Sequence, residues 1–391
     1  MTTETQLERY LAFIESDPNN IQLIANTANL AYESGQYQQA LNLADTGLKL
    51  EANHQILLST KALSFMSLGN IGEALTVFQQ LLSLGEQHPA IRYNMAYCYA
   101  LQQQHDQALP LLEDSLQHYA DMPQMLHLHV RILHELEALE DAIALGLQAL
   151  SLTSAVEASI NDLANGKVHE LLSSLYVDMA DFTAAKHHAA LALKTNPNLP
   201  NAHTSIGTAA LSTQDDQIAM QHFDQAITLN QQDGRAWLGK AMALMLQNKL
   251  AEAEVNFNTA ISHMPTHLSS YQALAWCQIS QNNLAAAQQT AQKALAIDDT
   301  FSENHGTLAV LAVMQGDIAL AQKHARIALG LDKASFSGNY AQALVLQAQG
   351  DDKGGQQMID RLLDSPEVIN QQNLRQFVLQ HQQKLQTQKL H

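Results

Sequence analysis

Small and branched apolar residues return along the chain every 34 positions, and this period dominates its hydrophobic pattern. In a frame that begins at Ile21, the twentieth position is Ala in nine repeats and Gly in the tenth. The twenty-eighth position is Leu or Ile in all ten repeats. The ten repeats begin at Ile21, Gln55, Pro89, Pro123, Gly166, Pro200, Gly234, Leu268, Ser302 and Phe336, with nine additional residues, 157–165, before the fifth.

A unit of this length cannot bury an apolar face alone, so the period predicts two helices that pack on each other and on the next pair. The eighth and twentieth positions are small because two helix backbones would cross there at about 8–10 Å. The Leu or Ile at position 28 is expected to fill the seam between repeats. Gly35, Gly69, Gly316 and Gly350 share position 15. Because Gly adopts positive φ readily, we expect the first helix of each repeat to end there.

Both ends of the chain are predicted to cap the stack of helix pairs. Leu7, Leu11 and Ile14 share one face of a first helix. A Gln-rich segment at the other end would cover the last repeat, because terminal repeats of a solenoid need a polar outer face. The predicted domains are residues 1–20 (capping helix), 21–156 (repeats 1–4), 157–165 (insertion), 166–369 (repeats 5–10) and 370–391 (capping helix).

These columns resemble the tetratricopeptide repeat (TPR) family, whose pattern runs from an aromatic residue through Leu, Gly and Tyr to Ala, Phe, Ala and Pro. Repeat 7 matches it with Trp237, Ala241, Leu244, Ala253, Phe257, Ala260 and Pro265. The chain departs from the pattern at Gln103 and Glu137, which replace the turn Gly, and at Val130 in position 8. The resemblance implies an all-α, right-handed α-solenoid of about ten helix-turn-helix units, and we expect a bacterial member of the family.

The resemblance also places positions 5, 9 and 12 of each first helix on an inner, concave surface. This stripe is aromatic and polar in repeats 3 and 4, and apolar and rich in Met in later repeats. A partner's apolar helix or extended segment could bind such a groove, although the same side chains could instead fill a tightly wound superhelix. The predicted partner-binding residues are Tyr93, Tyr97, His127, Arg131, His134, Leu238, Met242, Met245, Trp276, Ile279 and Met314.

Arg131 is the only Lys or Arg in this stripe, which makes it the candidate anchor for an acidic group of a partner. It could equally pair with Glu135, one helical turn away. Some TPR domains hold a partner's C-terminal carboxylate with Lys at position 5 and Asn at position 9. Position 5 never carries Lys here, and only Asn29 supplies Asn at position 9. A clamp of that kind is therefore not expected.

The composition agrees with long regular helices. Of 391 residues, 46% are hydrophobic and 15% charged, with 17 Gly and 8 Pro, which argues against collagen-like, β-sandwich and disordered chains. The formal charge of −18 disfavours nucleic-acid binding. Residues 1–165 carry 5 Lys+Arg and 19 Asp+Glu, a net −14, whereas residues 166–391 carry 15 and 19, a net −4. The first block could steer a basic partner or keep the solenoid soluble.

Motifs for catalysis and metal binding are lacking. Cys98 and Cys277 form no C-x-x-C pair, and phosphate-binding loops, nucleophile elbows and H-E-x-x-H are absent. We therefore expect no enzyme, no metal and no cofactor. Three repeats carry His at positions 4 and 23, which could form pH-responsive contacts or simply pack, since two ligands seldom make a metal site. These pairs are His169 with His188, His203 with His222, and His305 with His324.

The preferred hypothesis is a non-enzymatic protein–protein interaction scaffold or adaptor that binds a partner peptide or helix in the concave groove. The alternative is a regulatory sensor whose superhelix changes pitch when a peptide or small ligand binds, with the insertion as its hinge. RNA binding of the pentatricopeptide type conflicts with the charge and the period. A secretory leader and a membrane span are not visible, because the longest apolar run is Leu308 to Met314. The expected location is cytoplasmic, and the oligomeric state is not predicted.

Overall fold

The computed structural model describes residues 3–118, 122–153, 161–364 and 378. All regular structure in these residues is helical, in two compact parts, Met1–Ala164 and Asn165–His391. We call them the N-terminal part and the C-terminal part. The predicted C-terminal capping helix, apart from Val378, and the first four residues of the insertion lie outside the described residues.

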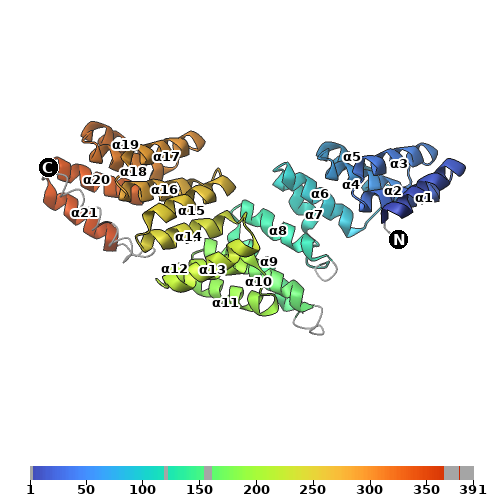
Figure 1. Cartoon of the computed structure of the whole chain (residues 1–391), viewed down its shortest axis with the longest axis horizontal. Helices are drawn as coiled ribbons and strands as arrows, with labels where there is room; N and C mark the ends of the chain where they lie inside the picture. Colours follow the sequence, from blue (N-terminus) through green and yellow to red (C-terminus); the bar gives the residue numbers. More distant parts are fainter. Residues whose placement is uncertain (1–2, 119–121, 154–160, 365–377, 379–391) are drawn as a thin grey trace. The chain divides into compact units, whose positions relative to one another are not determined.

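The N-terminal part begins with one helix, α1 (Thr3–Ser16), which packs on α2. Four helix pairs follow, and in each pair we call the first member helix A and the second helix B (Figure 1). The pairs are α2 (Ile21–Glu33) with α3 (Tyr37–Leu50), α4 (Gln55–Ser67) with α5 (Ile71–Ser83), α6 (Pro89–Leu101) with α7 (His105–Leu112), and α8 (Pro123–Glu135) with α9 (Leu139–Thr153).

The described residues of the C-terminal part contain six helix pairs (Figure 1). The last five residues of the predicted insertion extend α10, which therefore starts before its repeat frame. The pairs are α10 (Asn161–Asp178) with α11 (Phe182–Thr195), α12 (Pro200–Ser212) with α13 (Asp216–Leu229), α14 (Gly234–Leu246) with α15 (Leu250–His263), α16 (Leu268–Ser280) with α17 (Leu284–Ile297), α18 (Ser302–Met314) with α19 (Ile318–Leu331), and α20 (Phe336–Ala348) with α21 (Asp352–Asp364).

The boundaries of the helices follow the repeat frame predicted from the sequence. In nine of the ten repeats, helix A begins at the first position of the frame, and helix B begins at position 17 in all ten. Helix α7 has only eight residues and contains Pro110, which lacks the N–H that a helix interior requires. The all-α solenoid of helix pairs is therefore confirmed.

The columns of small residues are buried as expected, and one column behaves differently. Every residue at positions 8 and 20 is buried, including Val130, Gly207 and Gly355. Position 28 was expected to fill the seam, yet its Leu or Ile is only half-buried in nine repeats. The residue before it is buried in nine repeats. The side chain at position 27 therefore fills the seam between repeats, and the side chain at position 28 lies at the edge of that seam.

The turn between helices A and B has one conformation in all ten repeats. Residue 15 has φ between 77° and 95° where it is Gly, and between 57° and 61° where it is another residue. This left-handed region costs an L-residue roughly 1–2 kcal/mol. The six non-Gly residues that adopt it are Gln103, Glu137, Ala180, Gln214, Asn248 and Asn282.

We expect Ala180→Gly to raise the free energy of unfolding by about 1 kcal/mol, because Gly relieves the backbone strain at this turn. The reverse change, Gly35→Ala, should lower it by a similar amount, since a Cβ there meets no atom within 4 Å and only strain is added. Urea denaturation followed by circular dichroism measures both. A loss of stability in Ala180→Gly would contradict this explanation of the turn.

Candidate functional site

Helices α10, α12 and α14 of the C-terminal part form a cleft of about 510 Å³. Three consecutive repeats contribute to it, mainly through helix A, and His267 lies at its edge. Its volume falls in the range of small ligand and peptide pockets. The apolar side chains that line it are Leu171, Val177, Phe182, Leu211, Leu238 and Met242.

Hydroxyl groups also line the cleft, together with Asp178, Asn201, Arg235 and His267, and each hydroxyl donates its hydrogen within the protein. Ser205 Oγ donates to Asn201 O at 2.9 Å, Thr208 Oγ1 to Thr204 O at 3.0 Å, and Ser212 Oγ to Ala209 O at 2.7 Å. Thr204 Oγ1 donates to the buried carboxylate of Asp233 at 2.7 Å. A hydroxyl has one hydrogen and two lone pairs, so these groups can offer a ligand only acceptors.

One ion pair lines the cleft. Arg235 Nη2 of α14 lies 2.7 Å from Asp178 Oδ1 of α10, so the two opposite charges compensate each other. Burial lowers the pKa of nearby His267, and the positive charge of Arg235 lowers it further, while Asp178 raises it. The imidazole is consequently held neutral near pH 7. The cleft therefore presents no net charge to a ligand.

Two glycines allow α12, α13 and α14 to approach closely beneath this cleft. The ring of Phe223 lies where a Cβ of Gly207 or Gly239 would be. For Gly207 that Cβ would be 2.7 Å from the ring, inside van der Waals contact. Gly239 itself lines the cleft. Phe223 is fully buried, and it fixes the spacing of the two helices that carry Thr208 and Leu238.

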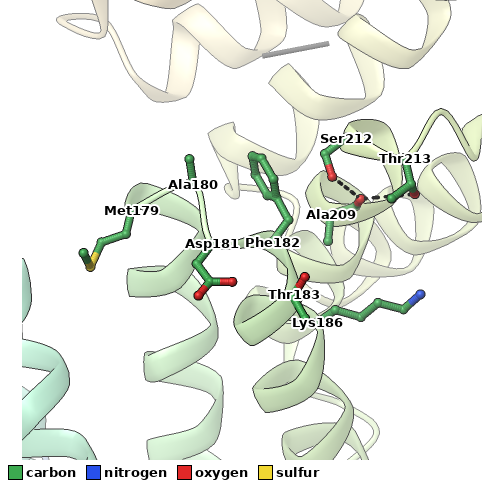
Figure 2. Close-up of a pocket in the computed structure, with 9 residues that line it drawn as sticks. All are labelled: Met179, Ala180, Asp181, Phe182, Thr183, Lys186, Ala209, Ser212 and Thr213. Atoms are coloured by element: carbon green, nitrogen blue, oxygen red, sulfur yellow. Dashed lines mark hydrogen bonds between the residues drawn. The ribbon is translucent and has the colours of Figure 1, made fainter. Parts of the chain in front are cut away.

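A second, more open cleft of about 670 Å³ lies beside the first, at the turn between α10 and α11 (Figure 2). Phe182 lines both clefts and therefore stands between them. Figure 2 shows its ring near Ala180, with the side chain of Lys186 directed away from it. Ser212 and Thr213 at the far side both donate to Ala209 O. Asp181, Thr183 and Lys186 also line this second cleft.

In the structure, the predicted binding residues of the C-terminal part fall into two groups: some line the first cleft, and others pack against the core. Leu238 and Met242 line the first cleft, and Met242 is 43% exposed. Met245 and Met314 are half-buried and pack against the hydrophobic core around α16, α18 and α20.

The expectation that Trp276 and Ile279 line an accessible groove is corrected. Trp276 is 7% exposed and Ile279 is fully buried, and the indole lies 6.1 Å from the ring of Tyr340 on α20. Side chains from α18 and α20 cover this stretch of the predicted stripe. Trp276 and Ile279 are therefore core residues.

In the N-terminal part, three predicted residues come together. The rings of Tyr93 and Tyr97 stack with centroids 6.2 Å apart, and the Arg131 guanidinium lies 6.0 Å from the Tyr97 ring. Burial raises the pKa of Tyr93. Arg131 Nε also lies 3.6 Å from Glu135 Oε1, so the predicted pairing within the helix is present. His127 and His134 are half-buried on the same helix, α8.

Most polar residues of the cleft were not among the binding residues predicted from the sequence. Thr204 and Thr208 occupy positions 5 and 9, the columns expected to be concave, but their small hydroxyl side chains gave no chemical signal. Reading every residue of those columns, whatever its type, would have found them. Arg235 and Phe182 occupy positions 2 and 17 and could not be found in that way.

Other kinds of site are not seen in the described part of the chain. It contains no group of three or more His, Cys, Asp or Glu placed to hold a metal ion. None of its helices has the length and hydrophobicity that crossing a membrane requires.

Comparisons with known protein families identify the type of repeat. Two family models described as tetratricopeptide repeat match the chain, one at residues 65–132 and 244–311, the other at residues 207–262. No curated protein matches it. All three matched segments fall within the ten 34-residue repeats described above.

Similar solved structures have low sequence identity to this chain. A human IFIT1 dimer with PPP-AAAA is 15% identical over 88% of this chain and 90% of its own, with a TM-score of 0.52. A monomeric IFIT1 mutant with Gppp-AAAA is 14% identical over 92% and 94%, with a TM-score of 0.53. A tetratricopeptide repeat protein from Parabacteroides merdae is 19% identical over 66% and 98%, with a TM-score of 0.46.

At these identities the likeness concerns the fold alone. The repeat frame, the ten helix pairs and the two family models agree with one another. The chain therefore contains tetratricopeptide repeats, matched at residues 65–132 and 207–311, within a solenoid of helix pairs.

Proposed function

We propose that this chain is a non-enzymatic protein–protein interaction scaffold that holds a segment of a partner protein in the cleft between α10, α12 and α14. Repeats of this family support such a scaffold role in general. The cleft is the observation that carries the specific proposal, because three repeats converge on it with an apolar wall and uncommitted acceptors. A partner segment would bury apolar side chains against Leu238 and Met242.

An extended segment fits this cleft better than a helix. The free hydrogen-bonding capacity of its hydroxyl groups consists of acceptors, which need N–H donors. An extended backbone has free N–H groups, whereas a helix uses them internally. Because Arg235 and Asp178 compensate each other, the lining of the cleft favours uncharged residues of a partner.

The two cysteines support a non-enzymatic role. Burial raises the pKa of the thiols of Cys98 and Cys277 to about 11. Both thiols therefore stay protonated near pH 7, and a protonated, buried thiol is a poor nucleophile.

The N-terminal part offers a second surface for the same scaffold role. Arg131 is 49% exposed and lies over Tyr97, which holds its guanidinium at the surface. Its contact with Glu135 at 3.6 Å is long for an ion pair. An acidic group of a partner could therefore replace Glu135 there with little loss.

A displayed library of linear nonapeptides tests the cleft. Peptides selected on the wild-type chain should bind Leu238→Glu and Thr208→Arg at least tenfold more weakly, because one change charges the wall and the other fills the cleft. The matched control is Val255→Glu, which places the same charge on α15 at a residue that is 65% exposed and outside the cleft. Equal binding to the wild type and to both cleft variants would remove this cleft from the proposal.

The conformation of the bound peptide is tested separately. A lactam bridge between residues i and i+4 of a selected peptide imposes a helix, and it should weaken binding at least tenfold. Thr208→Val, which removes an acceptor, should weaken binding more than Thr228→Val. Thr228 makes the same hydrogen bond to its own helix, at 2.8 Å, outside the cleft. Tighter binding of the bridged peptide would show that the occupant is helical.

A further inference from the structure

Three pairs of histidines join helix A to helix B in the C-terminal part. In each pair the imidazole at position 4 meets the imidazole at position 23 through the Nδ1 atoms. These atoms are 2.9 Å apart for His169 and His188, 2.9 Å for His203 and His222, and 3.2 Å for His305 and His324.

The position-4 side chains show which ring nitrogen carries the hydrogen. Trp237 Nε1 and Asn339 Nδ2 each donate to a backbone carbonyl six residues earlier, at 2.9 Å. His203 Nε2 lies 3.0 Å from the equivalent carbonyl of Pro197, and His305 Nε2 lies 2.9 Å from that of Asp299. A carbonyl only accepts, so both histidines carry hydrogen on Nε2.

It follows that Nδ1 of His203 and of His305 is an acceptor when the ring is neutral. The partner ring, on His222 or His324, must then donate its own Nδ1–H across the contact. The separations of 2.9 and 3.2 Å suit an N–H hydrogen bond. Two ligands of a tetrahedral zinc would lie about 3.4 Å apart. The two contacts of 2.9 Å are therefore shorter than a pair of zinc ligands would be, which favours a shared hydrogen.

The surroundings of these rings oppose additional positive charge. Burial lowers the pKa of His169, and lowers that of His188 to about 4, with His187 adding repulsion in both cases. Burial also lowers the pKa of His222 and of His324. Lys186 of α11 faces His222, and Lys323 of α19 lies beside His324.

We propose that the three histidine pairs are acid-labile contacts. They hold helix A against helix B in repeats 5, 6 and 9 and break when the pH falls. In repeats 6 and 9, a first proton from solvent binds the outer nitrogen of the position-23 ring and leaves the Nδ1–H···Nδ1 bridge intact. A second proton finds no free lone pair unless the bridge breaks. Two adjacent imidazolium ions then repel each other, and the two helices separate.

The direction of the pH effect follows from linkage. A histidine whose pKa is lower in the folded chain binds fewer protons there than in the unfolded chain. Its contribution to stability is complete above its ordinary pKa of about 6.5 and falls as the pH drops toward the folded value. Acid should therefore loosen these three repeats before their neighbours.

The neighbouring repeats provide built-in controls. Positions 4 and 23 hold Trp237 with Asn256 in repeat 7, Tyr271 with Thr290 in repeat 8, and Asn339 with Met358 in repeat 10. The Tyr271 hydroxyl donates to Pro265 O at 2.8 Å, the same carbonyl contact that His203 makes. None of these three pairs contains a histidine.

Hydrogen exchange of the full-length chain at pH 7.5 and 5.0, corrected for intrinsic rates, tests the proposal. Protection of the amides of α12 and α13 should fall at least tenfold more than that of α14 and α15. The double variant His203→Tyr with His222→Thr, which copies repeat 8, should abolish this difference. Equal losses of protection in the wild-type helices would overturn the proposal, even if the variant does not fold.

Zinc chloride distinguishes a proton contact from a metal site. The proposal expects no stoichiometric uptake at micromolar zinc and pH 7.5 in isothermal titration calorimetry. Tight uptake that the double variant reduces by one ion would overturn it, because the pairs would then be ligands.

Discussion

Gly306→Ala is expected to lower the free energy of unfolding of the C-terminal part by about 3 kcal/mol, the upper end of the usual cost of overpacking. A Cβ on Gly306 of α18 would collide with the backbone of Gly338 and Ser337 on α20. A flexible side chain could move aside, but the backbone of a helix cannot. The two helices would have to separate, and the contacts between them would be lost.

Gly330→Ala is the matched control for this change. Gly330 lies in α19, and a Cβ there meets no atom within 4 Å. Ala is favoured over Gly by up to about 1 kcal/mol within a helix, and by less at Gly330, the penultimate residue of α19. The control should therefore gain stability while Gly306→Ala loses it, as measured by urea denaturation. Two variants of equal stability would mean that α18 and α20 are not in backbone contact.

Trp276→Ala should cost about 3–5 kcal/mol, the usual loss when a buried aromatic side chain is deleted. The indole packs in the core with Tyr340 and Leu308. The variant should show a lower urea midpoint and altered near-UV circular dichroism. Its expected defect is therefore one of folding and not one of partner recognition.

Met242→Ala distinguishes a role in partner binding from a role in folding. This side chain is 43% exposed and lines the cleft, so its removal should change stability by no more than about 0.5 kcal/mol. The same variant should weaken peptide binding at the cleft. If Trp276→Ala were as stable as the wild type, the core assignment of Trp276 would be wrong.

Much of the fold could be predicted from the sequence because the repeats impose the same constraint ten times. Two helix backbones can cross closely only at small residues, and positions 8 and 20 satisfy this in the sequence and in the structure. The turn was harder to recognise, since Ala180 and Gln214 carry no turn signal. Their conformation follows from the packing of the helices on either side.

The binding surface could be predicted only in part, because the stripe at positions 5, 9 and 12 is not equally open along the chain. Leu238 and Met242 lie in a cleft, whereas Trp276 and Ile279 are covered. The difference depends on how closely successive helices A approach each other. Gly306 lets α20 come against α18, and no column of the repeat pattern encodes that distance.

Among the described residues of the C-terminal part, two hydrogen-bonded contacts skip a repeat. Arg235 reaches from repeat 7 to Asp178 in repeat 5, and Gln272 Nε2 of repeat 8 lies 3.3 Å from Ser337 Oγ of repeat 10. A solenoid whose repeats contact only their neighbours unfolds like a one-dimensional chain of coupled units. These bridges couple second neighbours as well. Partial unfolding should therefore proceed in blocks of three repeats, and a mutation in one repeat should alter the melting of the repeat two places away.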